Sequence, residues 1–205
     1  MQRKLPYRVD LMTIADLERV MEIEALAHAS PWPESAYRHE LENNELAQYL
    51  VVMPSASEAQ THPTVRQRIR NWLRRPRRGR PILGYAGFFV IVGEAHVSTI
   101  AVDPEWRGLG LGELLLLEML ERAIGMSGFL MTLEVRISNE TAQKLYEKYQ
   151  FEVVGQRKRY YQNNEDALIM TVSDILTPDY RALLDDKWWK LEARMRPTAP
   201  EVKTL

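Results

Sequence analysis

The chain has 205 residues, 45% of them hydrophobic and 27% charged, so it is long enough to bury the core of one globular domain. Its formal net charge is −1, which excludes an overall field that attracts nucleic acid or a membrane; any such preference must be local. It contains no cysteine, which excludes disulfides, thiolate zinc sites and a cysteine nucleophile.

The N-terminal segment does not have the pattern of a secretory signal. Residues 1–7 include basic side chains, but no apolar stretch follows them. The longest apolar runs of the chain are far shorter than a membrane span. Together with the absence of cysteine, these features predict a cytoplasmic protein.

Hydrophobic periodicity and turn residues predict strands and helices along the chain. A short strand is expected at 5–9, and Thr13 is a candidate N-cap of the first helix. Pro31 and Pro33 end that helix, because each proline disfavours helix in the residue before it, and a second helix is expected at 34–43. Further strands are expected at 48–53, 82–92, 95–102, 129–137, 151–159 and 167–172, with helices at 110–125 and 139–149. This order predicts an α/β fold with a mixed central sheet flanked by helices.

Residues 54–81 differ in composition from the segments on either side, which predicts an inserted loop. Residues 66–80 hold eight arginines and no acidic residue. Apolar side chains recur at helical spacing in a basic amphipathic pattern, at Val65, Ile69, Trp72 and Leu73. A helix over 65–80 would suit ribosomal RNA, an anionic membrane or an acidic protein surface. The alternative is a solvated excursion without a partner, as arginine-rich loops commonly are.

The end of the chain predicts one more helix. Apolar residues recur at helical spacing between Tyr180 and Met195, so a docking helix is expected near residues 178–196. The pattern does not decide whether this helix packs on its own domain or on a second copy. The expected organisation is a main domain at 1–175, with a basic insertion at 54–81, and a helical tail at 176–205.

The most informative stretch joins the strand that ends at Val102 to the helix that begins near Gly110. A proline turn at Pro104 is followed by three glycines in five residues, which include Gly108 and Gly112. Glycines let successive backbone N–H groups converge, and a helix N-terminus adds unpaired donors and a positive dipole end. A pyrophosphate fits such a loop without basic side chains. The glycines alone fit a simple tight connection equally well.

The spacing excludes two common nucleotide-binding loops. A Rossmann loop has Gly-x-Gly-x-x-Gly with an acidic residue about 20 positions later, and a P-loop has Gly-Lys-Ser/Thr. This chain instead has Arg107-x-x-Gly110-x-Gly112. That segment resembles the coenzyme A loop of the GNAT acetyltransferases, whose motif is Arg/Gln-x-x-Gly-x-Gly/Ala at the same junction.

The resemblance covers most of residues 7–173, apart from the insertion, and is strongest to the RimI-type ribosomal-protein alanine N-acetyltransferases. Further segments that carry it are 100–104, 133–139, 145–151, 159–161 and 165–170, with His28, Pro31 and Trp32 near the N-terminus. It implies the GNAT (acyl-CoA N-acyltransferase) fold, acetyl-CoA as cosubstrate and no metal. It also implies that the acceptor is the N-terminal amine, on alanine or a similar residue, of a small-subunit ribosomal protein.

Acetyl transfer to an amine needs a base that takes a proton from the ammonium and an acid that protonates the departing thiolate. The resemblance places the general base at Glu134 and the general acid at Tyr146. From pattern alone, Glu134 fits a solvent-facing strand residue and Tyr146 a packing aromatic on its helix. The amine attacks the thioester directly, so no covalent enzyme intermediate is required.

The resemblance also implies the coenzyme contacts. The backbone of Ile100, Ala101 and Val102 would pair with the pantetheine arm. The pyrophosphate would lie on the following loop, formed by Gly108, Leu109, Gly110, Leu111, Gly112 and Glu113. Asn139 matches a further coenzyme contact, although an asparagine there also suits a helix N-cap.

Glu113 departs from the family pattern, which often has arginine or lysine at this position. A carboxylate beside a pyrophosphate is unfavourable unless it points away. We therefore expect Glu113 to contribute only its backbone to the coenzyme site.

Two other functions remain as alternatives. The same scaffold could acetylate other protein N-termini, lysines or small amines, although Tyr160, Tyr161 and the Pro31–Trp32 segment match the peptide-acetylating subfamily. The second is a non-catalytic ribosome- or membrane-binding module that uses the insertion and the tail. The presence of Glu134, Tyr146 and the glycine loop argues against that module. We expect a monomer.

Overall fold

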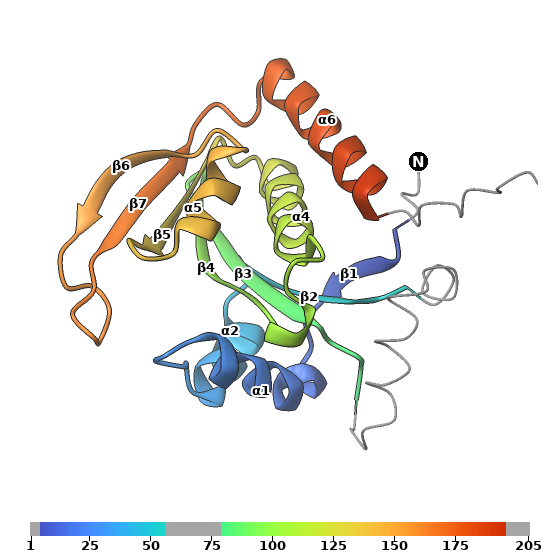
Figure 1. The fold of residues 1–205 in the computed structure, drawn as a ribbon, viewed down its shortest axis with the longest axis vertical. Coiled ribbons are helices and arrows are strands. Elements are labelled where there is room, and N and C mark those ends of the chain that lie inside the picture. The colour runs from blue at the N-terminus through green and yellow to red at the C-terminus, as the bar shows by residue number, and fades with distance from the viewer. Residues whose placement is uncertain (1–4, 56–78, 196–205) are drawn as a thin grey trace, which may run out of the picture.

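The computed structural model describes residues 5–55 and 79–195, which form one seven-stranded sheet and the helices around it (Figure 1). The strands are β1 Tyr7–Leu11, β2 Ala47–Pro54, β3 Gly84–Ile91, β4 Glu94–Val102, β5 Leu130–Arg136, β6 Glu152–Arg157 and β7 Ala167–Val172. The α-helices are α1 Leu17–Ala27, α2 Glu34–Asn43, α4 Leu111–Gly125, α5 Glu140–Glu147 and α6 Pro178–Met195, with 3₁₀ turns η1 Ile14–Asp16 and η2 Pro104–Trp106. The predicted α/β fold with a mixed sheet is confirmed.

The strand order, β1-β2-β3-β4-β5-β7-β6, is antiparallel throughout except between β4 and β5, which run parallel. These two strands pair at Glu94–His96 with Leu130–Thr132, near the start of both. Beyond that point β4 keeps its partner β3 as far as Val102 but is no longer bonded to β5. The sheet therefore opens into a wedge in its middle.

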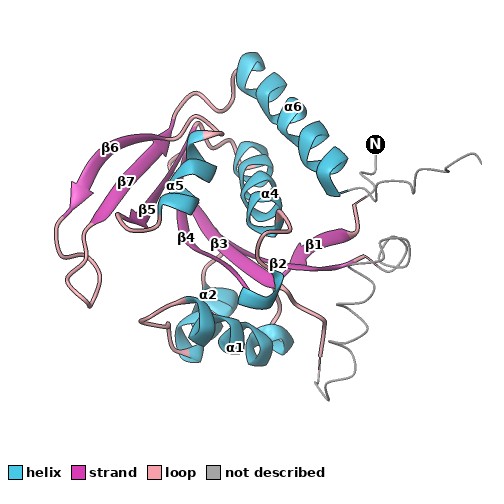
Figure 2. Cartoon of the chain, viewed as in Figure 1, coloured by secondary structure: helices cyan, strands magenta, loops and turns pink. Residues whose placement is uncertain are grey.

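Helices cover both faces of the sheet (Figure 2). α1 and α2 lie on one face, where Leu17, Val20 and Ile23 pack with the buried rings of Tyr37 and Tyr85. α4 and α5 lie on the other face, and α6 packs on α4 and shares its core cluster. The two hydrophobic cores fix the sheet between the helical layers.

Buried and partly exposed side chains alternate along β5. Met131, Leu133 and Val135 are buried in the core under α4. Successive strand side chains point to opposite faces, so Thr132 and Glu134 lie on the face of α1 and α2. The sequence pattern thus positions Glu134 on the face opposite α4.

The first helix begins later than expected. Thr13 precedes the short turn η1, and α1 starts at Leu17. The backbone N–H and hydroxyl of Thr13 donate to Asp16 Oδ2 at 2.7 and 2.8 Å. Asp16 also accepts a hydrogen bond from Arg80 Nε at 2.7 Å. This shared carboxylate ties the end of β1 to the segment that enters β3.

The predicted basic helix over 65–80 lies outside the described residues, apart from Gly79 and Arg80. Arg80 is a structural residue, because it contacts Asp16 and donates to the carbonyl of Leu11 at 3.0 Å. Within residues 5–55 and 79–195, no helix is both long and apolar enough to span a bilayer.

Candidate active site

The glycine loop between β4 and α4 has a backbone that only glycine adopts readily. Gly108 and Gly110 have φ angles of +79° and +80°, and Gly110 is the N-cap of α4. A Cβ added to Gly108 would meet no atom within 4 Å, so the space over this residue is open. The loop is anchored at its start, where Asp103 Oδ1 accepts from the N–H of Glu105 at 2.9 Å.

The wedge between β4 and β5 lies beside this loop. Ile100, Ala101 and Val102 are in the part of β4 that β5 no longer pairs, and the loop and α4 follow directly. An unpaired strand edge offers backbone donors and acceptors to an amide-containing arm. A helix N-terminus with converging N–H groups suits a pyrophosphate. These residues therefore fit coenzyme A.

Glu113 is buried in the first turn of α4, with 8% of its surface exposed. Its carboxylate accepts a hydrogen bond from the Tyr149 hydroxyl at 3.0 Å and forms an ion pair with Arg194 at 2.6 Å. Burial and the Glu113 charge raise the pKa of Tyr149 well above its ordinary value. The carboxylate thus already has two side-chain partners, one after α5 and one on α6.

Glu134 lies on β5, on the face opposite α4, and its side chain is 25% exposed. Arg157 Nη2, on β6, is 3.2 Å from Glu134 Oε1. The guanidinium of Arg157 also lies 5.3 Å from the centroid of the Tyr160 ring. Glu134 is therefore a half-buried carboxylate with one solvent-exposed partner, accessible to an incoming amine.

Tyr146 is buried on α5, and its ring centroid is 5.8 Å from that of Phe151. Burial, with a smaller effect from Tyr161, raises the pKa of Tyr146 well above its ordinary value. Burial also raises the pKa of Tyr161 to about 12, and the nearby charge of Glu134 contributes in the same direction. The ring of Tyr161 lies against the guanidinium of Arg136, whose central carbon is 3.7 Å from the ring centroid.

Asn139 is the N-cap of α5, because its Oδ1 accepts from the N–H of Ala142 at 3.2 Å. This confirms the capping role expected from the sequence. It leaves the coenzyme contact as a prediction.

The segment between α1 and α2 is held by Glu24, which is buried in α1. Its carboxylate accepts from the N–H of Trp32 at 2.8 Å and from the Tyr37 hydroxyl at 2.9 Å. Ser30, in the same segment, donates to Gln162 Oε1 at 2.9 Å, in the loop between β6 and β7. Two segments distant in sequence therefore meet beside the face that carries Glu134.

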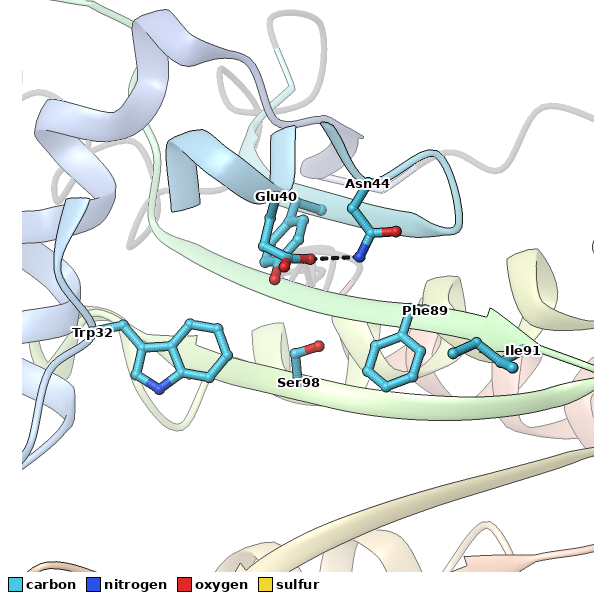
Figure 3. Close-up of a pocket in the computed structure, with 7 residues that line it drawn as sticks. Trp32, Glu40, Asn44, Phe89, Ile91 and Ser98 are labelled. Carbon is cyan, nitrogen blue, oxygen red and sulfur yellow. Dashed lines mark hydrogen bonds between the residues drawn. The ribbon is translucent and has the colours of Figure 1, made fainter. Parts of the chain in front are cut away.

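A pocket of about 220 Å³ lies on the same face. Its walls are Trp32, Glu40, Asn44, Tyr49, Phe89, Ile91 and Ser98, and Figure 3 shows Ser98 between Trp32 and Phe89. Phe89 stacks on His96 at 5.1 Å, and His96 is the β4 partner of Thr132, two residues before Glu134. Three of the seven lining residues are aromatic, and Glu40 and Asn44 are hydrogen-bonded to each other at the edge of the pocket.

Comparisons with known proteins agree with this geometry. The model of the acetyltransferase (GNAT) family matches residues 17–151, which include the glycine loop, β5 and α5. The chain belongs to the GNAT acetyltransferase family. The match stops before β6, β7 and α6.

This GNAT acetyltransferase has curated relatives along most of its length. A Bacillus subtilis protein, provisionally named a ribosomal protein bS18-alanine N-acetyltransferase, is 36% identical over 79% of this chain and 92% of its own. The N-alpha-acetyltransferase RimI of Mycobacterium tuberculosis is 33% identical over 80% of this chain and 91% of its own. The crystal structure of the Escherichia coli ribosomal-protein-S18-alanine N-acetyltransferase superposes with a TM-score of 0.65 at 26% identity. The match covers 82% of this chain and 94% of the other.

Several residues of this acetyltransferase's site were not predicted from the sequence. Arg157 and Arg194 are distant in sequence from the carboxylates that they contact, and Glu24 contacts groups that come after the end of its own helix. A charged residue on a predicted helix or strand most often faces solvent, so nothing local distinguished them.

Proposed function

We propose that this enzyme transfers an acetyl group from acetyl-CoA to the N-terminal amine of a small-subunit ribosomal protein, on alanine or a similar residue. The arrangement that carries the proposal is the glycine loop at the start of α4, beside a wedge in the sheet whose neighbouring strand bears Glu134. The acceptor class follows from the names of two curated relatives, which are 36% and 29% identical to this chain. A ribosomal acceptor also supports a cytoplasmic location.

The coenzyme would be held by backbone groups. The wedge edge at Ile100, Ala101 and Val102 pairs with the pantetheine arm, and the N–H groups of residues 108–113 bind the pyrophosphate. Asn139, at the start of α5, contacts the coenzyme as well as capping its helix. Bound acetyl-CoA supplies the activated thioester.

Glu134 acts as the general base. An N-terminal ammonium has a pKa of about 8, so removing its proton near neutrality costs little, and a half-buried carboxylate can accept that proton directly or through water. The neutral amine then forms the new C–N bond at the acetyl carbonyl carbon while the C–S bond breaks.

Tyr146 acts as the general acid. Because burial raises its pKa, the phenol keeps its proton at all physiological pH values. It donates this proton to the departing sulfur, so the products are an N-acetyl peptide and a free thiol. The new amide nitrogen loses its excess proton to solvent, the tyrosinate takes a proton back from solvent, and Glu134 releases the proton that it accepted before the next turnover.

The acceptor peptide is proposed to lie between the segment around Ser30 and the β6–β7 loop around Gln162. Their contact borders the face that exposes Glu134, and the adjacent residues Trp32, Tyr160 and Tyr161 supply aromatic surface. We further propose that 1–175 is the catalytic unit and that 176–205 is a tail added to it.

The test is an assay of purified protein with acetyl-CoA and short peptides that begin with Ala, Ser, Met or Gly. Release of free thiol and peptide mass are followed together, with an N-terminally blocked, lysine-containing peptide and spermidine as competing acceptor classes. The proposal expects a gain of one acetyl group at the α-amine. Acetylation only of lysine or spermidine would replace the acceptor class, and an absence of turnover would contradict the enzymatic proposal.

A further inference from the structure

Helix α6 follows the last strand and lies beyond the part of the chain that the family model matches. It runs along α4 (Figure 1). Near its start, the Tyr180 hydroxyl donates to the carbonyl of Tyr149 at 3.0 Å. Farther along, Trp188 Nε1 donates to Glu121 on α4 at 3.0 Å, and Arg181 pairs with the same carboxylate. These contacts fix α6 along α4.

The other end of α6 reaches the glycine loop. Leu191 Cδ1 and Met195 Cε lie 3.1 and 2.9 Å from the point where a Cβ on Gly110 would stand. Gly110 is the N-cap of α4 and has a left-handed conformation that glycine adopts readily, so the path of the loop depends on this residue. The packing of α6 and the shape of the loop are therefore coupled at one glycine.

Arg194 adds an electrostatic contact at the same end. It pairs with the buried Glu113 carboxylate at 2.6 Å, while about half of its own side chain is exposed. Glu113 belongs to the first turn of α4, the turn that would face the pyrophosphate. A buried carboxylate near a diphosphate is repulsive unless a cation neutralises it, and Tyr149, its other partner, supplies only a neutral donor.

We propose that Arg194 is a positioning residue for the coenzyme, which neutralises Glu113 and holds α6 against the glycine loop. This inference rests on the proposed function. It assigns the C-terminal helix a part in the coenzyme site, and it explains how this chain tolerates an acidic residue beside a pyrophosphate loop. Arg194 acts through Glu113 and Gly110 and need not touch the reacting atoms.

The chain offers a matched control. Arg181 also joins α6 to α4 through an ion pair, but with Glu121, about three turns of α4 away from Gly110. Arg194→Gln and Arg181→Gln each remove one interhelical ion pair of the same kind. Arg194→Lys keeps a cation at the loop.

Binding of coenzyme A is measured by calorimetry, and backbone amide exchange at residues 108–113 by mass spectrometry. Arg194→Gln should raise the Kd for coenzyme A about three- to tenfold and speed exchange of the loop amides, because one ion pair is lost. Arg181→Gln should leave both within about twofold, and Arg194→Lys should restore most of the affinity. Melting temperatures of the three variants control for general loss of stability.

Equal effects of Arg194→Gln and Arg181→Gln would overturn the inference, since α6 would then act only as a general support. If Arg194→Lys binds coenzyme A as weakly as Arg194→Gln does, the neutralising role is overturned. If the unmodified protein itself binds no coenzyme A, the proposed function fails. The amide-exchange comparison still tests the coupling of Arg194 to the loop in that case, because it needs no ligand.

Discussion

The carboxylate of Glu134 lies 3.2 Å from the guanidinium of Arg157, which reaches it from β6 across β7. More than half of the Arg157 side chain is exposed, and such pairs contribute at most about 1 kcal/mol. Glu134 is therefore weakly held, and in the proposed mechanism it exchanges Arg157 for the ammonium of the acceptor. This is the behaviour expected of a base that must release and rebind its partner in every cycle.

Replacing Glu134 with glutamine keeps the shape of the side chain but removes the proposed base. We expect kcat to fall about 100-fold at pH 7. Part of the loss should be recovered near pH 9, where the acceptor amine is already deprotonated in solution. The measurement is a pH–rate profile for a peptide acceptor. Glu140→Gln, at an exposed ion pair on α5, is the control. An unchanged kcat at pH 7 in the Glu134 variant would remove this residue from the mechanism.

Tyr146→Phe removes the proposed proton donor without opening a cavity. Burial raises the pKa of this tyrosine, so the phenol of the wild-type enzyme stays protonated. The turnover rate of the wild type should therefore not fall through loss of this proton up to about pH 10. The variant should lose about 100-fold in kcat and retain its affinity for coenzyme A. Tyr7→Phe, at another buried tyrosine on the edge strand β1, is the control. Weakened coenzyme binding with normal kcat would instead indicate a packing role.

Glu24→Gln tests how the acceptor side is built. The carboxylate accepts hydrogen bonds from both the Trp32 backbone and the Tyr37 hydroxyl, and an amide offers only one carbonyl oxygen for the two donors. Because one hydrogen bond is lost, we expect the KM for the peptide to rise about fivefold in this variant, while the Kd for coenzyme A stays unchanged. Initial rates over a peptide series check this. Glu18→Gln, exposed on the same helix, should leave KM unaltered.

The sequence was sufficient to predict the elements whose cause is local. Alternation in β5 placed Glu134 on one face, and the glycine spacing placed the turn into α4. The partners of Glu113 could not be predicted in this way. Arg194 reaches it from 81 residues away, and a lone arginine near the end of an amphipathic helix carries no local signal of burial or pairing.

The lowered pKa of Asp16 predicts how the free energy of unfolding depends on pH. Burial alone would raise its pKa, but hydrogen bonds from Arg80 and Thr13 outweigh burial and hold the pKa below the ordinary 3.8. A carboxyl group with a lowered pKa stabilises the fold fully above its ordinary pKa, and this contribution disappears as pH falls through the lower, folded value. We expect the free energy of unfolding in urea to decrease below about pH 4.

Asp16→Asn should remove this pH-dependent part of the free energy of unfolding. At pH 7 the variant should be less stable by about 2 kcal/mol, because Arg80 loses its main partner. Asp10→Asn, at a more exposed contact of Arg80, should cost less than about 1 kcal/mol. If Asp16→Asn and the wild type lose stability in parallel below pH 4, other carboxylates cause the acid dependence.

Gly84→Ala tests the strand edge that would receive the pantetheine arm. A Cβ at Gly84 would stand 2.7 Å from the carbonyl oxygen of Ala101 and 3.2 Å from the Cα of Val102, and these backbone atoms cannot rotate away. β4 must shift where it borders the wedge, so we expect a loss of about 2 kcal/mol in unfolding free energy and weaker binding of coenzyme A. Gly155→Ala, whose Cβ meets only ordinary side-chain contacts at 3.4 Å or more, should change stability by less than about 0.5 kcal/mol. If Gly84→Ala loses stability yet binds coenzyme A as tightly as the wild type, the exact position of Ala101 and Val102 does not determine binding, and the arm must be held elsewhere.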